Sequence, residues 1–344
     1  MKRLLNILVF MILSIFYFLM CIFLFFLLII VDIFVKNGRR REKIMKFLQF
    51  IFYHVTLIYF GFYFCKPIPI SYNRKVFDSK KCLAISNHIT NYDWWFFFVI
   101  LNHFGKFYNL KIVLKKSLEK VPLFGYAMKV YGYIFLSRKI TEDEDVLDRK
   151  LKEINLLNDY TLLFFPEGTV FESGTKERSL KYSLAHNIKI NNKPFPHDRV
   201  LLPKKTGYKI VLKKMITFDS LLDFTIGTIP YEKMPYEKYN FKNIFVDRTQ
   251  IFNLFFILDY KNDKHELYND DFIYHDFYLK ELALKEMDTQ NDFDGNKLHS
   301  VHQKMYKYKK DDLIYEEVCT WKNRYYFVIL FFYFVVFYLG YLIF

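Results

Sequence analysis

The chain has 344 residues, enough for one large domain or two smaller ones. Hydrophobic residues make up 53% of it and aromatic residues 21%, which exceeds a typical water-soluble enzyme and favours a membrane protein. The formal net charge of +14 suits anionic lipid headgroups or polyphosphate ligands, or reflects only solvated lysines. Nucleic acid is not an expected partner, because no nucleic-acid-binding signature accompanies the charge. Four scattered cysteines form no CxxC pair, which argues against a zinc site and a disulfide framework.

The N-terminal region, residues 1–66, contains two apolar segments, 4–31 and 47–65. The first has 28 uncharged positions, more than the ~20 that cross a bilayer. It is also longer than the core of a signal peptide and lacks a small-residue cleavage site, so we interpret it as an anchor. The second segment carries Gln49 and His54, and it either spans the membrane or forms a hairpin within one leaflet. The basic cluster at 36–43 between them is expected to face the cytosol.

The other end of the chain, 325–344, is a further uncharged stretch of 20 residues and predicts a C-terminal transmembrane helix. Between the anchors, residues 67–232 alternate short apolar runs with helical segments. This pattern predicts an α/β catalytic domain with a mostly parallel sheet layered by helices. We expect strands at 81–86, 111–115, 133–136, 160–165 and 223–229, and helices at 92–104, 122–130 and 176–187.

A cluster of four acidic residues, EDED, follows Thr141. Acidic residues suit the first turn of a helix, so we expect Thr141 to cap a helix here and do not expect a metal site. Residues 233–324 form a mixed, charged extension with a strand at 251–259, a helix at 271–288 and a flexible stretch at 288–310. We assign this extension no function and expect it to pack on the catalytic domain.

The stretch SNHITNYDWW, residues 86–95, contains the first candidate catalytic group. His88 and Asp93 cannot pair from one helix, because five residues place their side chains about 140° apart. They meet if His88 ends a strand and Asp93 lies in the first turn of the next helix, where Thr90 and Asn91 are suitable N-caps. A carboxylate would then fix one imidazole nitrogen and leave the other as a base. The alternative is that Asp93 only caps a helix.

Spacing alone does not decide between these interpretations. His265 and Asp270 have the same spacing, inside HELYND, but lack the preceding apolar run. A second polar group follows the apolar run YTLLFF, where Pro166, Glu167, Gly168 and Thr169 stand at a predicted strand end. Ligands in open α/β sheets bind at the carboxyl ends of the strands, so we favour a site there over a plain turn.

These segments together resemble a known family. NHITNYDWW is similar to the NHxxxxDW signature of the lysophospholipid and 1-acylglycerol-phosphate acyltransferases, and FPEGT at 165–169 is similar to their FPEGTR signature. The intervening block 116–139 contains the GxxFxxR arrangement that ends at Arg138. LLPKKTGY at 201–208 resembles the LxPRTxGF segment of the lysocardiolipin and lysophosphatidylinositol branch.

The resemblance implies roles for individual residues. His88 would be the general base and Asp93 its orienting carboxylate, while no enzyme nucleophile is needed. The substrate-binding residues would be Asn87, Arg138, Glu167, Gly168, Thr169 and Lys205. Lys205 is taken to replace the arginine of the LxPRTxGF segment. Val170 replaces the arginine that often follows FPEGT, and Pro230 comes one residue later than in the family's TxAYP pattern, which puts the headgroup contacts in question.

The expected activity is transfer of an acyl group from acyl-CoA to the sn-2 hydroxyl of a lysophospholipid, such as lysophosphatidylinositol or lysocardiolipin. Acyl-CoA is a co-substrate, and no bound cofactor or metal is expected. One alternative is a 1-acyl-sn-glycerol-3-phosphate acyltransferase that makes phosphatidic acid, and another is a catalytically silent lipid-binding membrane protein. A lipid hydrolase is disfavoured, because no GxSxG motif occurs. The expected partners are membrane lipids, and the expected location is the endoplasmic reticulum membrane.

The helix after Asp93 is unusually aromatic, with the sequence WWFFFVIL. Its side chains, Trp94 and Trp95 among them, either form part of the core or enter the lipid interface. Beside the membrane segments, we expect the interface, which would let the acceptor reach His88 without leaving the membrane.

Overall fold

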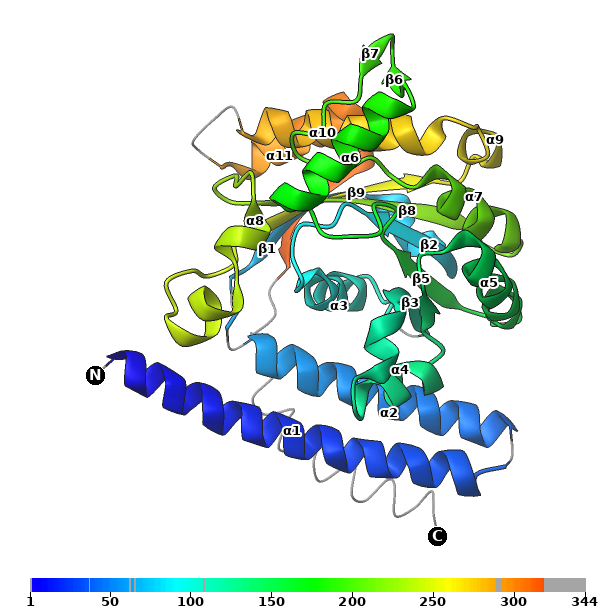
Figure 1. Cartoon of the computed structure of the whole chain (residues 1–344), viewed down its shortest axis with the longest axis vertical. Coiled ribbons are helices and arrows are strands. Elements are labelled where there is room, and N and C mark those ends of the chain that lie inside the picture. The colour runs from blue at the N-terminus through cyan, green and yellow to red at the C-terminus, as the bar shows by residue number, and fades with distance from the viewer. Residues whose placement is uncertain are drawn as a thin grey trace.

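A single eight-stranded sheet forms the centre of the computed structural model, which describes residues 2–36, 38–61, 63–64, 66–107, 109–288 and 293–318 (Figure 1). The predicted C-terminal membrane helix at 325–344 lies outside these residues. The strand order is β10-β1-β9-β8-β2-β5-β3-β4. The strands are β1 (Ile68–Asn73), β2 (Lys81–Ser86), β3 (Leu110–Lys115), β4 (Ile134–Leu136), β5 (Tyr160–Phe164), β8 (Ser220–Thr228), β9 (Leu254–Lys261) and β10 (Leu313–Val318), and a separate hairpin pairs β6 (Lys189–Ile190) with β7 (Lys193–Pro194).

The sheet is mostly parallel, as the sequence predicts. Strands β2, β3, β4, β5 and β8 pair in parallel, as do β1 and β9, whereas β1–β10 and β8–β9 are antiparallel. The continuous apolar runs of β2 and β5 are buried, because helices cover both faces of a parallel sheet. Parallel pairing also brings the carboxyl ends of β2, β5 and β8 to one edge.

Helices cover both faces of this sheet. Side chains of α3 pack on one face, and those of α5, α7, α10 and α11 form a second core on the other. The helices are α1 (Lys2–Phe34), α2 (Gly38–Gly61), α3 (Asp93–His103), α4 (Phe124–Val130), α5 (Ile140–Asn155), α6 (Ser173–Ala185), α7 (Lys205–Lys214), α8 (Pro235–Lys238), α9 (Lys264–Leu267), α10 (Phe272–Asp288) and α11 (Gly295–Tyr306), with short 3-10 turns η1 (Arg74–Asp78), η2 (Lys116–Lys120) and η4 (Lys310–Asp312) and a π-helical turn η3 (Lys242–Val246).

The acidic EDED segment begins α5, but Thr141 is not the cap that we expect. The N-cap is Lys139, and Thr141 already lies inside the helix. Asp143 instead accepts the backbone N–H groups of Ser137 and Arg138, both at 2.7 Å. A carboxylate in the first turn therefore closes the preceding loop, which leaves no need for a threonine cap.

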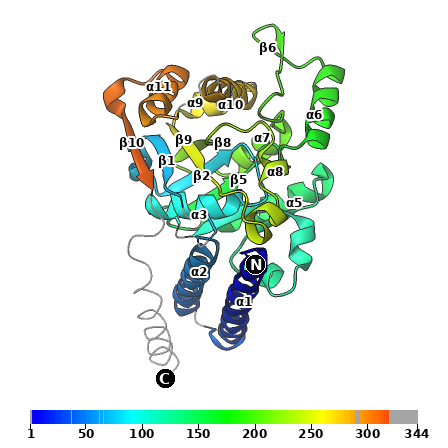
Figure 2. The ribbon, with the colours of Figure 1, turned by 90° about the vertical axis from the view of Figure 1, so that its left-hand side faces the viewer.

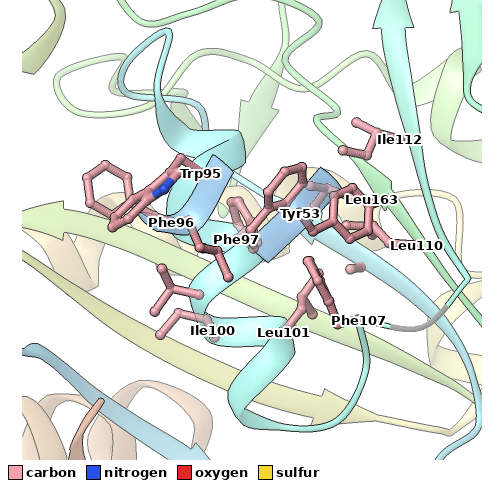
Figure 3. Close-up of a cluster of buried hydrophobic side chains, with 14 of the residues drawn as sticks. Tyr53, Trp95, Phe96, Phe97, Ile100, Leu101, Phe107, Leu110, Ile112 and Leu163 are labelled. Carbon is pink, nitrogen blue, oxygen red and sulfur yellow. The ribbon is translucent and has the colours of Figure 1, made fainter. Parts of the chain in front are cut away.

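The aromatic helix α3 is part of the protein core. The expectation that it enters the lipid interface is therefore wrong for Trp95 and Phe96. Trp95 is 0% exposed and Phe96 is 2% exposed, and Figure 3 shows both inside a cluster of buried side chains. The indole Nε1 of Trp95 donates a hydrogen bond to the carbonyl of Thr56 in α2, at 3.3 Å. Helix α2 thus lies between α3 and helix α1 (Figure 1).

The two N-terminal helices form an antiparallel hairpin along one side of the catalytic body (Figure 2). Both are long and apolar enough to cross a membrane by length and composition. Large apolar side chains are exposed along α1 from Leu4 to Phe34. Half of the apolar stretch of α2 is instead buried, and Tyr53 of α2 shares a 2.6 Å hydroxyl–hydroxyl hydrogen bond with Tyr133 at the sheet edge. The two segments therefore differ: α2 packs on the domain, and α1 faces outward.

The extension after residue 232 completes the sheet. Strand β9 lies between β1 and β8, and β10 forms the edge beyond β1, so the boundary that we expect at 232 falls within one sheet. The expectation of a flexible stretch at 288–310 is wrong for α11, because Leu298 and Val301 are buried in the core that α10 shares.

Candidate active site

His88 and Asp93 meet in the way that the sequence suggests. His88 follows β2, and Asp93 is the first residue of α3. The Nδ1 atom of His88 lies 2.8 Å from Oδ2 of Asp93. Because the loop between them reverses the chain at the carboxyl end of β2, the two side chains converge at the sheet edge where ligands bind in α/β folds.

The Asp93 carboxylate is fixed by its own loop. It is 0% exposed and accepts the backbone N–H groups of Ile89 (2.7 Å) and Thr90 (3.0 Å) and the Thr90 hydroxyl (2.6 Å). Thr90 is therefore a partner of the carboxylate, whereas the residue in the N-cap position is Tyr92. A carboxylate held by three donors keeps one orientation and stabilises Nδ1–H of His88 as the donor.

The His88 ring is held on its face as well. It stacks on Phe165, with ring centroids 4.3 Å apart and planes 25° apart. Its side chain remains 21% exposed, and Nε2 has no hydrogen-bond partner among the described residues. The imidazole thus has one nitrogen fixed by Asp93 and one available to a substrate, which is the arrangement of a general base.

Asn87 does not have the substrate-binding position that the resemblance implies. Its side chain is 1% exposed, and its Nδ2 donates to the carbonyl of Ile226 while its Oδ1 accepts the N–H of Ile226, both at 2.9 Å. These paired bonds join the end of β2 to β8. Asn87 therefore fixes the backbone that carries His88.

Glu167 likewise acts on the backbone of the site. It is 2% exposed, its Oε2 accepts the N–H of His88 at 2.6 Å, and its Oε1 accepts the N–H of Leu201 at 2.7 Å. Burial raises the pKa of Glu167, whereas the two N–H donors lower it. With both oxygens used by the protein, this carboxylate joins two loops and leaves none of its oxygens to a substrate phosphate.

A pocket of about 540 Å³ opens beside His88, between α5, α6, α7 and the end of β5. Phe165 lines it and also stacks on His88, so the pocket and the base share a wall. The predicted residues Arg138, Gly168 and Thr169 line it too. Much of the wall is apolar, but it also holds cationic side chains.

Four cationic side chains line this pocket, and two of them, Arg138 and Lys204, lie close enough to affect each other. Burial lowers the pKa of Arg138, and burial together with repulsion from Arg138 lowers the pKa of Lys204. Neither makes a side-chain ion pair within the described part of the chain. Two neighbouring cations without a protein anion form a suitable site for a phosphate.

Lys205, which the sequence analysis matched to the family arginine, is not the lysine that lies near Arg138. Its Nζ pairs with Asp271 at 2.9 Å and lies over the ring of Tyr274. Counting along LxPRTxGF from Leu201 in fact puts the arginine at Lys204, so the sequence alone contained the correct match. A Cβ on Gly168 would lie 3.2 Å from Cε of Lys204, which shows how closely that lysine passes over the FPEGT loop.

Comparisons with known proteins bear on the family and the fold. Residues 69–230 match the family model described as Acyltransferase. This segment, slightly less than half of the chain, therefore matches an acyltransferase domain, and the resemblance seen in the sequence is confirmed.

Two relatives illustrate the range of the family. The 2-acyl-1-lysophosphatidylinositol acyltransferase of Saccharomyces cerevisiae is 31% identical over 48% of this chain and 49% of its own length. The lysocardiolipin acyltransferase 1 of Gallus gallus is 31% identical over 43% of this chain and 39% of its own length. The matches thus span about half or less of these relatives.

A solved structure shares the fold. The 1-acyl-sn-glycerophosphate acyltransferase of Thermotoga maritima superposes with a TM-score of 0.52, covering 85% of this chain and 100% of that one. At 13% identity, this similarity establishes the architecture alone.

Proposed function

We propose that the chain is an acyl-CoA-dependent lysophospholipid acyltransferase that esterifies the sn-2 hydroxyl. The observation that carries the proposal is the His88–Asp93 pair, 2.8 Å apart, whose imidazole stacks on Phe165, a residue that also lines a pocket with cationic side chains. The match of residues 69–230 to the acyltransferase family model supports acyl transfer as the reaction class.

In the proposed reaction, Nε2 of His88 accepts the hydroxyl proton of the acceptor. The hydroxyl oxygen forms a bond to the thioester carbonyl carbon of acyl-CoA, and the carbon–sulfur bond then breaks. The CoA thiolate leaves and takes the proton from the imidazolium, so the base is restored. Asp93 stabilises the imidazolium and keeps Nδ1 protonated, and general-base catalysis of this kind contributes about 10²- to 10⁴-fold.

The two cations suit an acceptor that carries a phosphate. Arg138 and Lys204 would bind the phosphate oxygens, and the apolar wall would contact the glycerol backbone and the start of an acyl chain. Gly168 allows this arrangement, because its φ of +72° suits glycine and a side chain there would press on Lys204.

We propose lysophosphatidylinositol or lysocardiolipin as the acceptor, in line with the headgroups in the names of two relatives. The yeast relative is named for a 2-acyl-1-lyso acceptor, whose free hydroxyl is at sn-1, so it supports the headgroup and not the sn-2 position. Lysophosphatidic acid is the second candidate, because another relative, of Arabidopsis thaliana, is named a probable 1-acyl-sn-glycerol-3-phosphate acyltransferase and is 34% identical over 44% of this chain and 40% of its own length. Both candidates place one phosphate beside the glycerol, which fits the Arg138–Lys204 pair.

A panel assay tests the proposal. The purified full chain in detergent receives labelled acyl-CoA and each of lysophosphatidylinositol, lysocardiolipin, lysophosphatidic acid and lysophosphatidylcholine. We expect diacyl product with the first two acceptors and none with His88→Ala. Product from lysophosphatidic acid alone would favour the second candidate. No product from any acceptor would overturn the enzymatic proposal and favour a silent lipid-binding protein.

We also propose that the protein is attached to the membrane of the endoplasmic reticulum. The exposed apolar side chains along α1 support attachment, because an apolar surface of this length is stable in contact with lipid and costly in water. Extraction by detergent but not by carbonate tests the attachment, and imaging of a tagged chain tests the compartment.

A further inference from the structure

The segment that carries Lys204 is irregular in structure, yet its backbone is fully bonded. We call residues 199–204 the strap. It contains no helix or strand before α7, although Val200, Leu201 and Leu202 are buried. Buried backbone N–H groups outside regular structure need other partners, so each donor of the strap identifies what holds it in place.

Side chains from α10, α6 and the loop after β5 accept four of these donors, and a backbone carbonyl accepts the fifth. The N–H groups of Arg199 and Val200 donate to Oε2 of Glu281, at 2.8 and 2.9 Å. Leu201 donates to Glu167, and Leu202 donates to the hydroxyl of Ser179 in α6 at 3.0 Å. The N–H of Lys204 donates to the carbonyl of Pro166 at 2.8 Å. Because residue 203 is proline, every N–H of the strap is accounted for.

Glu281 is the partner that comes from outside the acyltransferase segment 69–230. It lies in α10, is 2% exposed, and also pairs with the guanidinium of Arg199 at 3.5 Å. Arg199 is held further by Asp288 of the same helix, at 2.7 Å. The C-terminal extension therefore holds the first half of the strap through hydrogen bonds to its backbone and ion pairs with Arg199.

The second half of the strap forms the cationic wall of the pocket. Leu202 and Lys204 line it, and Lys204 passes over Gly168. Helix α10 reaches the same pocket through Tyr274. A shift of the strap by one ångström would move the lysine relative to Arg138, and binding sites are sensitive to displacements of that size.

We propose that Glu281 is a positioning residue for the acceptor: it holds the strap so that Lys204 meets the acceptor phosphate together with Arg138. This rests on the proposed acyltransferase function. It gives the C-terminal extension a role in the site, since α10 then acts on the substrate through the strap without touching the reacting atoms.

Kinetics with two matched variants test the inference. Glu281→Ala removes a carboxylate oxygen that accepts two consecutive backbone N–H groups. Asp219→Ala removes the same kind of contact at the opposite end of the sheet, where Oδ2 accepts the N–H groups of Lys80 and Lys81 at 3.1 and 3.0 Å. We expect Glu281→Ala to raise the acceptor KM about tenfold with kcat nearly unchanged, and Asp219→Ala to leave KM unchanged.

Three further measurements make the result decisive. Glu281→Gln, which keeps an acceptor oxygen, should regain part of the affinity for the acceptor. The variant Lys204→Met should raise the acceptor KM by itself, and adding Glu281→Ala should raise it little further, because both changes act on one contact. Urea unfolding of each variant in detergent shows whether it is folded, and if Glu281→Ala is not, Glu281→Gln provides the comparison.

Each outcome has one meaning. Additive effects of Glu281→Ala and Lys204→Met, or an equal rise in KM for Asp219→Ala, would overturn the positioning role while leaving the enzyme assignment intact. An unchanged KM in folded Glu281 variants would do the same. Wild-type protein without activity on any acceptor would instead overturn the proposed function, and the two failures are therefore distinguishable.

Discussion

Two histidines in this chain are each followed by aspartate at the fifth position, and the structure treats them differently. His88 and Asp93 are bonded at 2.8 Å, and the carboxylate is fully buried. His265 lies in the short helix α9 and is exposed, and Asp270 pairs with Lys209 at the surface with 76% of its side chain exposed. The same spacing therefore gives a paired base in one region and two unrelated surface residues in the other.

The difference comes from what precedes and surrounds each pair. His88 follows a buried parallel strand, and the loop after it supplies N–H donors to the Asp93 carboxylate. His265 follows Asp263, which uses its own carboxylate to cap α9 by accepting the N–H of His265 at 2.9 Å. A histidine and an aspartate at this spacing thus pair only when a strand end and a turn bring them to the same edge.

Removal of the imidazole should give the largest difference in kcat between the His88 and His265 pairs. We expect His88→Ala to lower kcat about 10³-fold or more, because no second base pairs with Asp93 among the residues that the structure describes, whereas His265→Ala leaves kcat unchanged. Initial rates with saturating acyl-CoA and acceptor measure both. Comparable loss in the two variants would show that the paired geometry has no catalytic meaning.

Changing the carboxylates gives the next largest effect. Asp93→Asn places an amide against Nδ1 of His88 and disturbs the tautomer that leaves Nε2 free, so we expect kcat to fall about 10²-fold. Asp270→Asn removes only a surface pair with Lys209 and should change kcat less than about twofold. The test is the ratio of the two rates, with circular dichroism as the check that both variants fold. A small effect for Asp93→Asn would reduce that residue to a capping role.

Much of the sheet could be predicted because its central strands are continuous apolar runs that end in Pro, Gly or Asn. The β2 and β5 segments match their predictions within a residue. The sequence does not predict β1 and β10, since IPISYN and LIYEEV are short, partly polar segments whose pairing depends on residues far away in sequence. No local pattern reveals that β9 lies between β1 and β8.

The site shows the same limit. Local motifs identified His88, Asp93 and Arg138, but they assigned substrate contacts to Asn87 and Glu167, whose polar atoms bond the protein backbone instead. Which partner a polar side chain finds is a property of the folded chain, because a buried group must be satisfied by whatever lies beside it.

The helices that follow the two pairs extend the comparison to stability. Trp95 of α3 is fully buried, and we expect Trp95→Ala to lower the free energy of unfolding by about 3–5 kcal/mol. Tyr268, just after α9, is 48% exposed and donates one hydrogen bond to the carbonyl of Leu212, so Tyr268→Ala should cost about 1 kcal/mol. Urea unfolding in detergent measures both. If Trp95→Ala left stability unchanged and weakened binding to lipid vesicles, the buried position of α3 would be contradicted.

The smallest expected effect is a difference in pH dependence between two lysines, Lys204 in the pocket beside the His88 site and Lys209 next to Asp270. Lys209 pairs with Asp270, whereas burial and repulsion from Arg138 lower the pKa of Lys204 from the ordinary lysine value. A lysine must be protonated to bind phosphate. As pH rises through the lowered pKa, Lys204 loses its charge earlier than a lysine with the ordinary pKa would, and kcat/KM for the acceptor should fall on the alkaline side. Lys204→Arg keeps its charge in that range, so its kcat/KM should decline at higher pH, with values within a fewfold of wild type near neutrality.

Lys209→Arg is the matched control and should reproduce the wild-type profile, because its partner is a protein carboxylate rather than the substrate. Profiles of kcat/KM against pH, corrected for spontaneous thioester hydrolysis, measure all three proteins. If Lys204→Arg and wild type declined together, the alkaline limb would belong to another group, and Lys204 would not be the titrating phosphate contact. If kcat/KM declined at higher pH in Lys204→Arg alone, the result would show that Lys204 binds the substrate phosphate.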